Sequence, residues 1–230
     1  MIIFLDTETT DGTKECKICQ LAFRVDSINY VTYAKNSAPI TFEAMAIHHI
    51  TNEMVENAPF LVESDIYKKL LELNTPDNYI VAHNAAFDLQ ALSNHGFINQ
   101  MRIIDTVKIS KALLETKWYK LQYLRYALGL YKSEEERIQP HDALSDILVL
   151  EKLFNYFQVT FQLSAENMCT LSNQRNFVRR MPFGKHKGTL IEKIDSDYLF
   201  WILNNATQLD DDLKFSIIHT LKQNGFIQTE

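Results

Sequence analysis

The amino-acid sequence predicts an α/β fold, a mixed five-stranded sheet flanked by helices, with a small additional module at the C-terminal end. Three observations lead to this prediction. Strand-like apolar runs crowd the first 36 residues, helical and strand patterns then alternate up to about residue 157, and the later residues have a different, more basic character. A strand meander followed by alternating helices and strands is typical of a mixed sheet with helices on its faces.

The strands are predicted from short apolar runs that are bounded by turn residues. The first, "IIFLD", opens the chain, and two further runs follow that can pair with it as an antiparallel meander. The last two, "YIVAH" and "RIIDT", are each followed by a helical pattern. The five predicted strands cover residues 2–6, 17–28, 30–36, 79–83 and 102–106.

The helices are predicted where apolar residues recur every three or four positions and where capping residues mark the ends. Ser64 can cap one helix, and Gly96 and Gly129 follow two others. A long, mostly apolar helix from Asp142 to about Phe157 is expected to pack against the sheet. The predicted helices of this part cover residues 42–48, 64–73, 85–96, 107–115, 120–130 and 142–157.

The rest of the chain is predicted to form a separate module. A helix over 164–175 leads into a basic turn bracketed by glycines, and two more helical patterns follow at 196–206 and 212–224. We place the boundary at the start of the range 160–175, which gives a first domain of residues 1–160 and a module of residues 161–230.

The bulk composition narrows the class of protein. No apolar stretch approaches the length that crosses a bilayer, and the N-terminus lacks a secretory signal, so we expect a cytoplasmic protein without a membrane partner. Three cysteines cannot form a disulfide framework, and the pair Cys16 and Cys19 lacks a second Cys or His pair for zinc. We therefore favour a structural role for this pair over metal binding or redox chemistry.

The net charge of −6 argues against a protein that binds nucleic acid over its whole surface. The charge is uneven, however. Between Arg175 and Lys193 the chain carries six Lys or Arg and one Glu, a local balance of +5, so the remainder sums to −11. A basic segment beside an acidic body is compatible with local binding of phosphates.

Two acids at the end of the first strand raise the main functional question. Asp6 and Glu8 follow the apolar run and, because side chains along a strand alternate, both point to the same face. Two like charges beside a buried strand repel each other and resist desolvation. Each acid could also be an ordinary solvated strand end, so this pair becomes informative only together with other residues.

Three further residues complete an acidic group with one histidine. Asp88 lies in the first turns of the helix after the fourth strand, and His141 and Asp146 lie at the start of the long helix. Carboxylates that converge in this way need cations between them, and Mg²⁺ prefers carboxylate and phosphate oxygens. Two such ions can stabilise both the attacking and the leaving oxygen of a phosphoryl transfer.

His141 suits a different task from the acids. Mg²⁺ seldom binds imidazole, so a histidine beside such a site is better suited to accept a proton from water. Each of these residues could instead have a structural role. Asp88 lies at a helix start, where the helix dipole favours an acid, and His141 could cap the long helix. For Asp105, in "IIDTV", we expect only the structural role of a helix cap.

The motifs around these residues resemble those of the DEDD superfamily of 3′→5′ exonucleases, in its histidine-containing branch, a group that includes DnaQ-like and ribonuclease T-like enzymes. "FLDTET" is similar to the first family motif, "HNAAFD" to the second and "HDALSD" to the third, with its H-x-A-x-x-D spacing. "IHHIT" at 47–51 resembles the family segment I-H-G-I-T. The resemblance covers residues 2 to about 157.

The resemblance implies a ribonuclease H-like fold and two Mg²⁺ or Mn²⁺ ions. It implies a 3′→5′ exonuclease that releases 5′-mononucleotides, with His141 activating the attacking water. The implied metal ligands are Asp6, Glu8, Asp88 and Asp146. The implied contacts with the terminal nucleotide are Thr9, Thr10, His48, Asn84 and Phe87, where a purely structural role is as plausible for Asn84 and Phe87.

The sequence departs from the family pattern at two positions. The family commonly has Thr-Gly directly after D-x-E-T, whereas this chain has Thr10 and Asp11 before Gly12. The glycine of I-H-G-I-T is replaced by His49. Neither departure affects an implied metal ligand, but both affect the loops expected near the nucleotide.

The C-terminal segment "RRMPFGKHKGTLIEKIDSDYLFWIL" resembles the corresponding module of exonuclease X-like proteins. Its glycines bracket a turn that presents Lys185, His186 and Lys187, which could bind DNA phosphates or form a basic turn without a ligand. Tyr198 and Trp201 could stack on bases, but their helical spacing favours packing in the core. Because of this tail we expect DNA as the substrate, as single strands or frayed 3′ ends, and the resemblance implies a role in DNA repair. The alternatives are a 3′→5′ exoribonuclease, a polymerase proofreading subunit, and an inactive relative that only binds nucleic acid or a partner protein.

Overall fold

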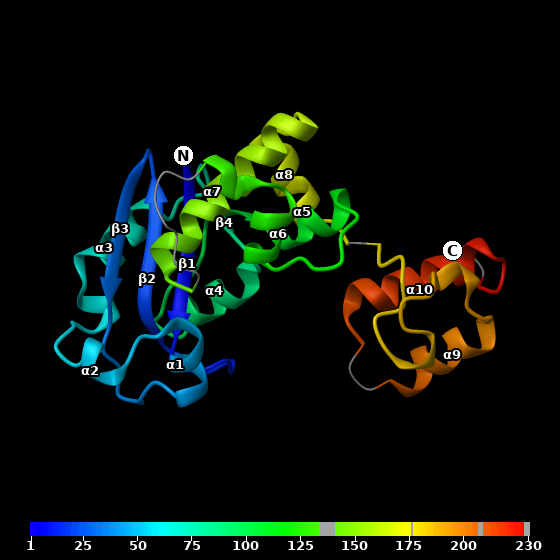
Figure 1. The fold of residues 1–230 in the computed structure, drawn as a ribbon, viewed down its shortest axis with the longest axis horizontal. Helices are drawn as coiled ribbons and strands as arrows, with labels where there is room; N and C mark the ends of the chain where they lie inside the picture. Colours follow the sequence, from blue (N-terminus) through cyan, green and yellow to red (C-terminus); the bar gives the residue numbers. More distant parts are fainter. Residues whose placement is uncertain (134–140, 176, 207–208, 228–230) are drawn as a thin grey trace. The chain divides into compact units, whose positions relative to one another are not determined.

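The computed structural model describes residues 1–133, 141–175, 177–206 and 209–227. It divides into two compact units, Met1–Ser172 and Asn173–Glu230 (Figure 1). Each unit has its own hydrophobic core and is described by itself. Within the described residues, no helix is long and apolar enough to cross a membrane.

The first unit is built on a five-stranded sheet with the order β3-β2-β1-β4-β5. The strands β1, β2 and β3 are antiparallel neighbours, whereas β1, β4 and β5 run parallel to each other. The sheet is therefore mixed, as predicted. Its strands are β1 (Ile2–Thr9), β2 (Ile18–Val25), β3 (Ile28–Tyr33), β4 (Tyr79–Ala82) and β5 (Arg102–Asp105).

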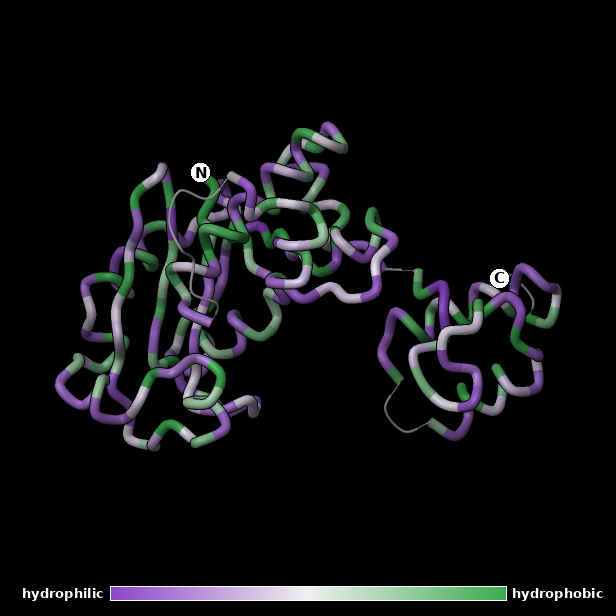
Figure 2. The backbone as a smooth tube through the Cα atoms, in the orientation of Figure 1, coloured by the Kyte–Doolittle hydropathy of each residue, from purple (hydrophilic) through white to green (hydrophobic). Residues whose placement is uncertain are grey.

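Strand β1 supplies both faces of the sheet with apolar side chains. Ile3 and Leu5 join one buried cluster, and Phe4 joins the cluster on the other face. Figure 2 shows hydrophobic residues, in green, recurring along the strands of the sheet. The buried core residues of the strands are among them. Because of this alternation, Asp6 and Glu8 lie on the face of Phe4, the face that α7 covers.

The register of β1 leaves one of its edges to a helix. Its pairing with β4 ends at Phe4, whereas its pairing with β2 continues to Thr9. Helix α4 starts after the end of β4 and packs against β1. The carboxyl end of β1 therefore lies between β2 and the first turns of α4.

Helices pack on both faces of the sheet. Leu70 of α3 and Leu92 of α4 join the cluster of Ile3 and Leu5, and Phe154 of α7 meets Phe4 edge to face at 5.4 Å. The helices of this unit are α1 (Phe42–His48), α2 (Asn52–Val55), α3 (Asp65–Leu73), α4 (Ala85–Ser93), α5 (Thr106–Leu113), α6 (Leu121–Ala127), α7 (Ala143–Phe161) and α8 (Ala165–Asn173).

Two predicted helix starts of the first unit are capped as expected, whereas α4 ends at Ser93 with Asn94 as its cap, before Gly96. Ser64 accepts from the backbone N–H of Tyr67, and Asp105 accepts from the N–H groups of Val107 and Lys108. Asp105 therefore has the structural role that the sequence predicted. The charged sequence "SEEERIQP" at 133–140 also predicts a loop, and from residue 134 onward it lies outside the described residues.

The boundary between the units falls after Ser172, inside the range 160–175 that the sequence predicts but later than residue 160. The difference is due to α8, which the sequence pattern assigns to the C-terminal module. Met168 and Cys169 of this helix are buried in the same cluster as Phe4 and Phe154. Burial of this apolar face attaches α8 to the first unit.

Cys16 and Cys19 are both buried, but they join different hydrophobic clusters. The one group of potential metal ligands found among the described residues does not include them. Burial raises the pKa of the Cys19 thiol to about 12, so this thiol stays protonated and unreactive near neutral pH. The packing agrees with a structural role for the pair.

The C-terminal unit is a small helical module. It contains α9 (Ser196–Asn205) and α10 (Asp211–Gln223), preceded by the 3₁₀ turns η3 (Gly184–His186) and η4 (Ile191–Lys193). Its core is made of the buried side chains of Met181, Ile191, Ile194, Leu199, Ile202, Leu213, Ile217 and Leu221. The two glycines of the basic turn, Gly184 and Gly188, both adopt positive φ, at 69° and 84°.

Candidate active site

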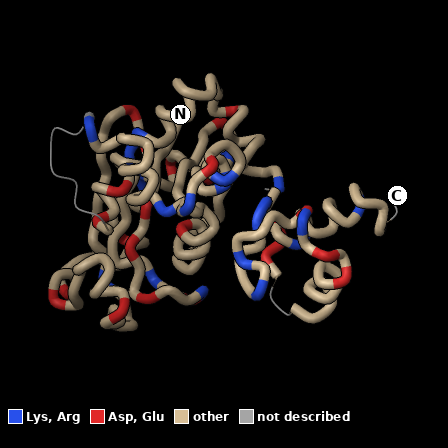
Figure 3. Tube along the Cα trace, turned by 45° about the vertical axis from the view of Figure 1, so that its right-hand side comes forward, with Lys and Arg blue, Asp and Glu red and all other residues tan. Residues whose placement is uncertain are grey.

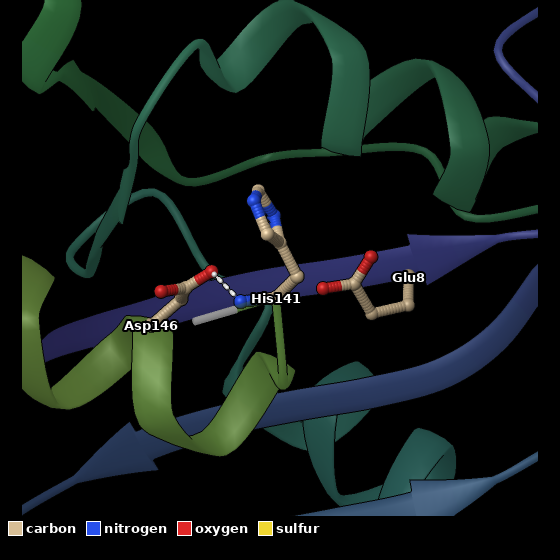
Figure 4. Close-up of side chains that lie close together, drawn as sticks. All are labelled: Glu8, His141 and Asp146. Atoms are coloured by element: carbon tan, nitrogen blue, oxygen red, sulfur yellow. Dashed lines mark hydrogen bonds between the residues drawn. The ribbon is translucent and has the colours of Figure 1, made fainter. Parts of the chain in front are cut away.

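The site is formed at the carboxyl end of β1. One oxygen or nitrogen atom from each of Glu8, His141 and Asp146 lies within 4.8 Å of the corresponding atoms of the other two (Figure 4). Glu8 comes from β1, Asp146 from the first turn of α7, and His141 from the loop directly before α7. Three of the five predicted catalytic residues are thus brought together although more than 130 positions separate Glu8 from His141 and Asp146 along the chain.

Asp6 and Asp88 lie outside that close group but interact with it. Burial, followed by the charges of Asp88, Asp146 and Glu8, raises the pKa of Asp6 well above its usual range. Asp88 is buried on α4 and its pKa is raised to about 7, mainly by desolvation. Thr7 holds Asp88 in place, because its hydroxyl donates to Asp88 Oδ1 at 2.8 Å.

The four acids repel one another unless a cation lies between them. The pKa of Glu8 is raised to about 8, first by burial and then by the charges of Asp146 and Asp88. Burial also raises the pKa of Asp146. Carboxylates that remain close in a folded protein despite this repulsion are the oxygen ligands that Mg²⁺ and Mn²⁺ prefer. The residues present therefore fit a divalent metal site.

His141 is fixed at its backbone and exposed at its side chain. Its N–H donates to Asp146 Oδ2 at 3.2 Å, and its φ of 60° belongs to the left-handed region. Figure 4 shows the imidazole projecting from the loop beside Glu8 and Asp146. This position permits proton transfer to or from a molecule held at the carboxylates.

Two glutamines that the sequence analysis missed support α7 and Asp146. Gln20, buried on β2 in register with Glu8, accepts from the N–H of Ala143 at 3.0 Å and donates to Asp142 Oδ1 at 3.0 Å. Gln122 of α6 donates to Asp146 Oδ1 at 2.5 Å. A polar residue in the otherwise apolar stretch "ICQLAF" was the signal that could have identified Gln20.

The structure places Thr9 at the end of β1 and Thr10 directly after it, at the start of a hydrogen-bonded turn. Both are buried, and their hydroxyls donate to the carbonyl and the carboxylate of Asp11, at 2.7 and 3.0 Å. Asp11 also accepts from the N–H of Thr13 at 2.8 Å. The residue that displaces Gly12 relative to the family pattern thus organises the turn itself.

His48 is buried with both ring nitrogens engaged. Its Nδ1 accepts from the N–H of Ile50 at 3.0 Å, so Nε2 carries the proton and donates to the carbonyl of Thr9 at 3.2 Å. Burial lowers the pKa of this imidazole. His48 therefore positions the Thr9 loop, and its contact with a nucleotide stays a prediction.

The position of His49 explains why the family has glycine there. His49 ends α1 with a φ of 62°, a left-handed conformation that glycine adopts without strain. Asn84 begins α4 in the same region, with a φ of 78°. At position 49 this chain therefore has a histidine in a conformation that glycine adopts with less strain.

Asn84 and Phe87 line a pocket of about 350 Å³ at the start of α4. The loop after Thr10 forms its other wall, through Gly12, Thr13 and Lys14. The two residues predicted to shape a nucleotide site thus share one cavity with the loop that departs from the family pattern. Lys185, His186 and Lys187 belong to the second unit, where Lys185 and Lys187 are exposed.

The match to a family model decides the family. The model described as exonuclease, of the RNase T type, matches residues 3–154. This chain belongs to the RNase T exonuclease family. The predicted family and its fold are therefore confirmed.

Individual relatives agree with this assignment. The chain is 28% identical over 193 residues to "Exodeoxyribonuclease 10" of Escherichia coli K12, covering 80% of each protein. It is also 28% identical to "DNA polymerase III subunit epsilon" of Buchnera aphidicola, covering 86% of this chain and 92% of the relative. The chain is thus an exodeoxyribonuclease homologue.

Solved structures share the fold. A structure of exonuclease X in complex with 5′ overhanging duplex DNA matches with a TM-score of 0.62 and 24% identity, covering 75% of this chain and 100% of that one. Exonuclease I of E. coli in complex with a dT13 oligonucleotide matches with a TM-score of 0.60 and 14% identity, covering 91% and 61%.

The C-terminal unit matches a different family model. Residues 173–228 match the model described as "Putative quorum-sensing-regulated virulence factor". The matched range coincides with the second compact unit, which begins at Asn173. That description names no chemical activity for the unit.

Proposed function

We propose that this protein is a metal-dependent 3′→5′ exodeoxyribonuclease that releases 5′-mononucleotides from DNA 3′ ends. The observation that carries the proposal is the convergence of Glu8, His141 and Asp146 within 4.8 Å, beside Asp6 and Asp88. Membership of an exonuclease family and the names of the relatives support this choice of reaction and of DNA.

Asp6, Glu8, Asp88 and Asp146 would hold two divalent cations, Mg²⁺ or Mn²⁺. When bound, such ions supply Lewis-acid stabilisation of negative charge on the phosphate and on the leaving oxygen. The protein contributes the fixed positions of the ligands. Thr7 orients Asp88, Gln122 orients Asp146, and Gln20 anchors the end of α7 that carries Asp146.

His141 would accept the proton of the attacking water. Its backbone is bonded to Asp146, so its imidazole stays next to the acids while its exposed face remains open to water. An imidazole can accept a proton from water and release it again. The terminal nucleotide would lie against Thr9, Thr10, Asn84 and Phe87, with His48 supporting the Thr9 loop.

The test is hydrolysis of 5′-labelled single-stranded DNA in Mg²⁺, with matched RNA in parallel. We expect a ladder of DNA products that shortens stepwise from the 3′ end. Asp146→Asn should abolish it, whereas Asp65→Asn, a change at an exposed acid of α3, should leave it unchanged. A ladder on RNA alone would make the protein an exoribonuclease.

The absence of products on both substrates, with Mn²⁺ as well, would overturn the enzyme proposal. It would favour an inactive relative that only binds nucleic acid or a partner protein. Thermal unfolding separates the two cases, because a cation that binds the folded protein raises its melting temperature. Wild type should show this shift and Asp146→Asn should show a smaller one.

A further inference from the structure

The C-terminal unit exposes an aromatic side chain that its sequence pattern assigned to the core. Trp201 on α9 is 57% exposed, whereas its neighbours Leu199 and Ile202 are buried. Only Tyr198 follows the expectation, since it packs partly against the core of the unit. The prediction was wrong for Trp201, because the core-facing stripe of α9 passes through residues 199 and 202 and leaves 201 outside.

Trp201 is part of an ordered group of rings. It stacks on Tyr198, with 5.8 Å between ring centroids and 18° between ring planes. On Tyr198, His186 packs edge to face at 4.6 Å, and Lys185 Nζ lies 4.5 Å from the ring centroid. Lys185, Tyr198 and Trp201 line an open pocket of about 490 Å³.

The backbone of the basic turn is shaped for this contact. Gly184 has a φ of 69°, and a Cβ atom at this position would lie 3.0 Å from the hydroxyl oxygen of Tyr198. Glycine therefore lets the turn approach the ring closely. The contact between the turn that carries Lys185 and the aromatic pair therefore depends on Gly184 as well as on the two rings.

The chemistry of the group selects a planar, anionic ligand. An exposed indole offers a flat face to stack on, and nucleobases gain binding energy from such stacking whatever their sequence. Lys185 beside the rings would repel a cationic ligand and attract a phosphate. Six Lys or Arg lie between Arg175 and Lys193, and Figure 3 shows Lys and Arg along the first segments of this unit.

We propose that the C-terminal unit carries a second site, separate from the acidic centre, that binds single-stranded nucleic acid. Trp201 stacks on a base, and Lys185 and Lys187 contact the adjacent phosphates. The proposal does not depend on hydrolysis by the first unit. It rests on the proposed function only for the choice of DNA as the probe.

The first test measures ligand binding by the fluorescence of Trp201. The chain has two tryptophans, so Trp118→Phe leaves Trp201 as the single one. We expect oligothymidylate, added to this full-length variant in EDTA, to quench the fluorescence saturably, because a stacked base contacts the indole. Fluorescence that does not change at any concentration of oligonucleotide would overturn the proposal.

The second test compares affinities of full-length variants for a labelled oligothymidylate in EDTA. Trp201→Ala should weaken binding by about five-fold or more, and Trp201→Phe, which keeps a ring, by less. Phe226→Ala is the matched control, because Phe226 is 56% exposed on the same unit and should be dispensable. Lys185→Ala should reduce the salt dependence by about one phosphate contact.

Equal affinities of Trp201→Ala and Phe226→Ala would overturn the proposal, provided that both variants unfold at the wild-type temperature. The outcome is separate from that of the hydrolysis test. Binding that depends on Trp201 without any hydrolysis would contradict only the proposed activity. Hydrolysis together with binding that does not depend on Trp201 would contradict only the second site.

Discussion

Replacement of Glu8 by glutamine should make the metal-free protein more stable while it removes the activity. The side chain of glutamine has the shape of the acid but no charge. In the absence of metal, burial of Glu8 and then the charges of Asp146 and Asp88 raise its pKa from 4.5 to about 8. An uncharged residue removes this repulsion, so the stability of the fold and the function of the site oppose each other at this position.

The size and pH dependence of the effect follow from the pKa. Between pH 4.5 and about 8 the folded protein holds a proton that the unfolded chain has released, so wild-type stability falls as the pH rises. Each pH unit corresponds to ~1.4 kcal/mol, which gives ~3 kcal/mol between pH 4.5 and pH 7. Water at the partly exposed carboxylate reduces the expected gain to about 1–2 kcal/mol.

Urea denaturation in EDTA at pH 5 and at pH 7 would measure this gain. We expect Glu8→Gln to be more stable than wild type at pH 7 and nearly equal to it at pH 5. Glu56→Gln, at an exposed acid after α2, is the control and should show no gain at either pH. Added Mg²⁺ should stabilise wild type more than Glu8→Gln, because the variant has lost a ligand.

Two results would refute the reasoning. The first is a Glu8→Gln variant that is less stable than wild type at pH 7 without metal. The second is a gain that is the same at pH 5 and pH 7, since a gain without pH dependence would come from packing and not from relief of charge repulsion. Either result would mean that burial and the neighbouring charges do not destabilise the ionised Glu8 in the folded protein.

Three further predictions concern residues around the same centre. His141→Ala should lower the hydrolysis rate by about 10²–10⁴-fold, measured on labelled DNA, and should leave the Mg²⁺-dependent thermal shift in place; loss of that shift would make His141 a metal ligand instead of a base. Gln20→Leu leaves the N–H of Ala143 without its partner, so it should cost about 1–3 kcal/mol of stability in urea and lower the hydrolysis rate; unchanged stability would exclude this anchoring role. His49→Gly should raise stability by about 0.5–1 kcal/mol, because glycine adopts a φ of 62° without strain; a loss would show that the histidine side chain contributes more than its backbone conformation costs.

The order of strands and helices could be predicted because it depends on local patterns. Apolar runs marked the strands, and Ser64 and Asp105 marked helix starts that the structure confirms. The alternation along β1 also predicted that Asp6 and Glu8 share a face. Each of these inferences used residues less than about ten positions apart.

The supports of the site could not be predicted in the same way. Gln20 and Gln122 reach α7 and Asp146 across 123 and 24 positions of sequence. A glutamine carries no pattern that names its partner. Such contacts follow only from the register of β2 against β1 and from the packing of α6 on α7.

Helix α8 and Trp201 show the same contrast between sequence pattern and burial. The sequence analysis places α8 in the C-terminal module, and only its burial against Phe4 and Phe154 assigns it to the first unit. Trp201 had a helical spacing that suits a core, and only the direction of the buried stripe of α9 left it exposed.

The sequence by itself determined the elements of the fold, the acids and the histidine that belong to an exonuclease family, and the basic turn. These depend on residue type and on short-range periodicity, which are properties of the chain alone. The tertiary structure decided which faces are covered, which glutamines hold the acids and which aromatic ring remains open to a ligand. Burial, unlike periodicity, depends on what packs against a surface, and that partner can come from any point along the chain.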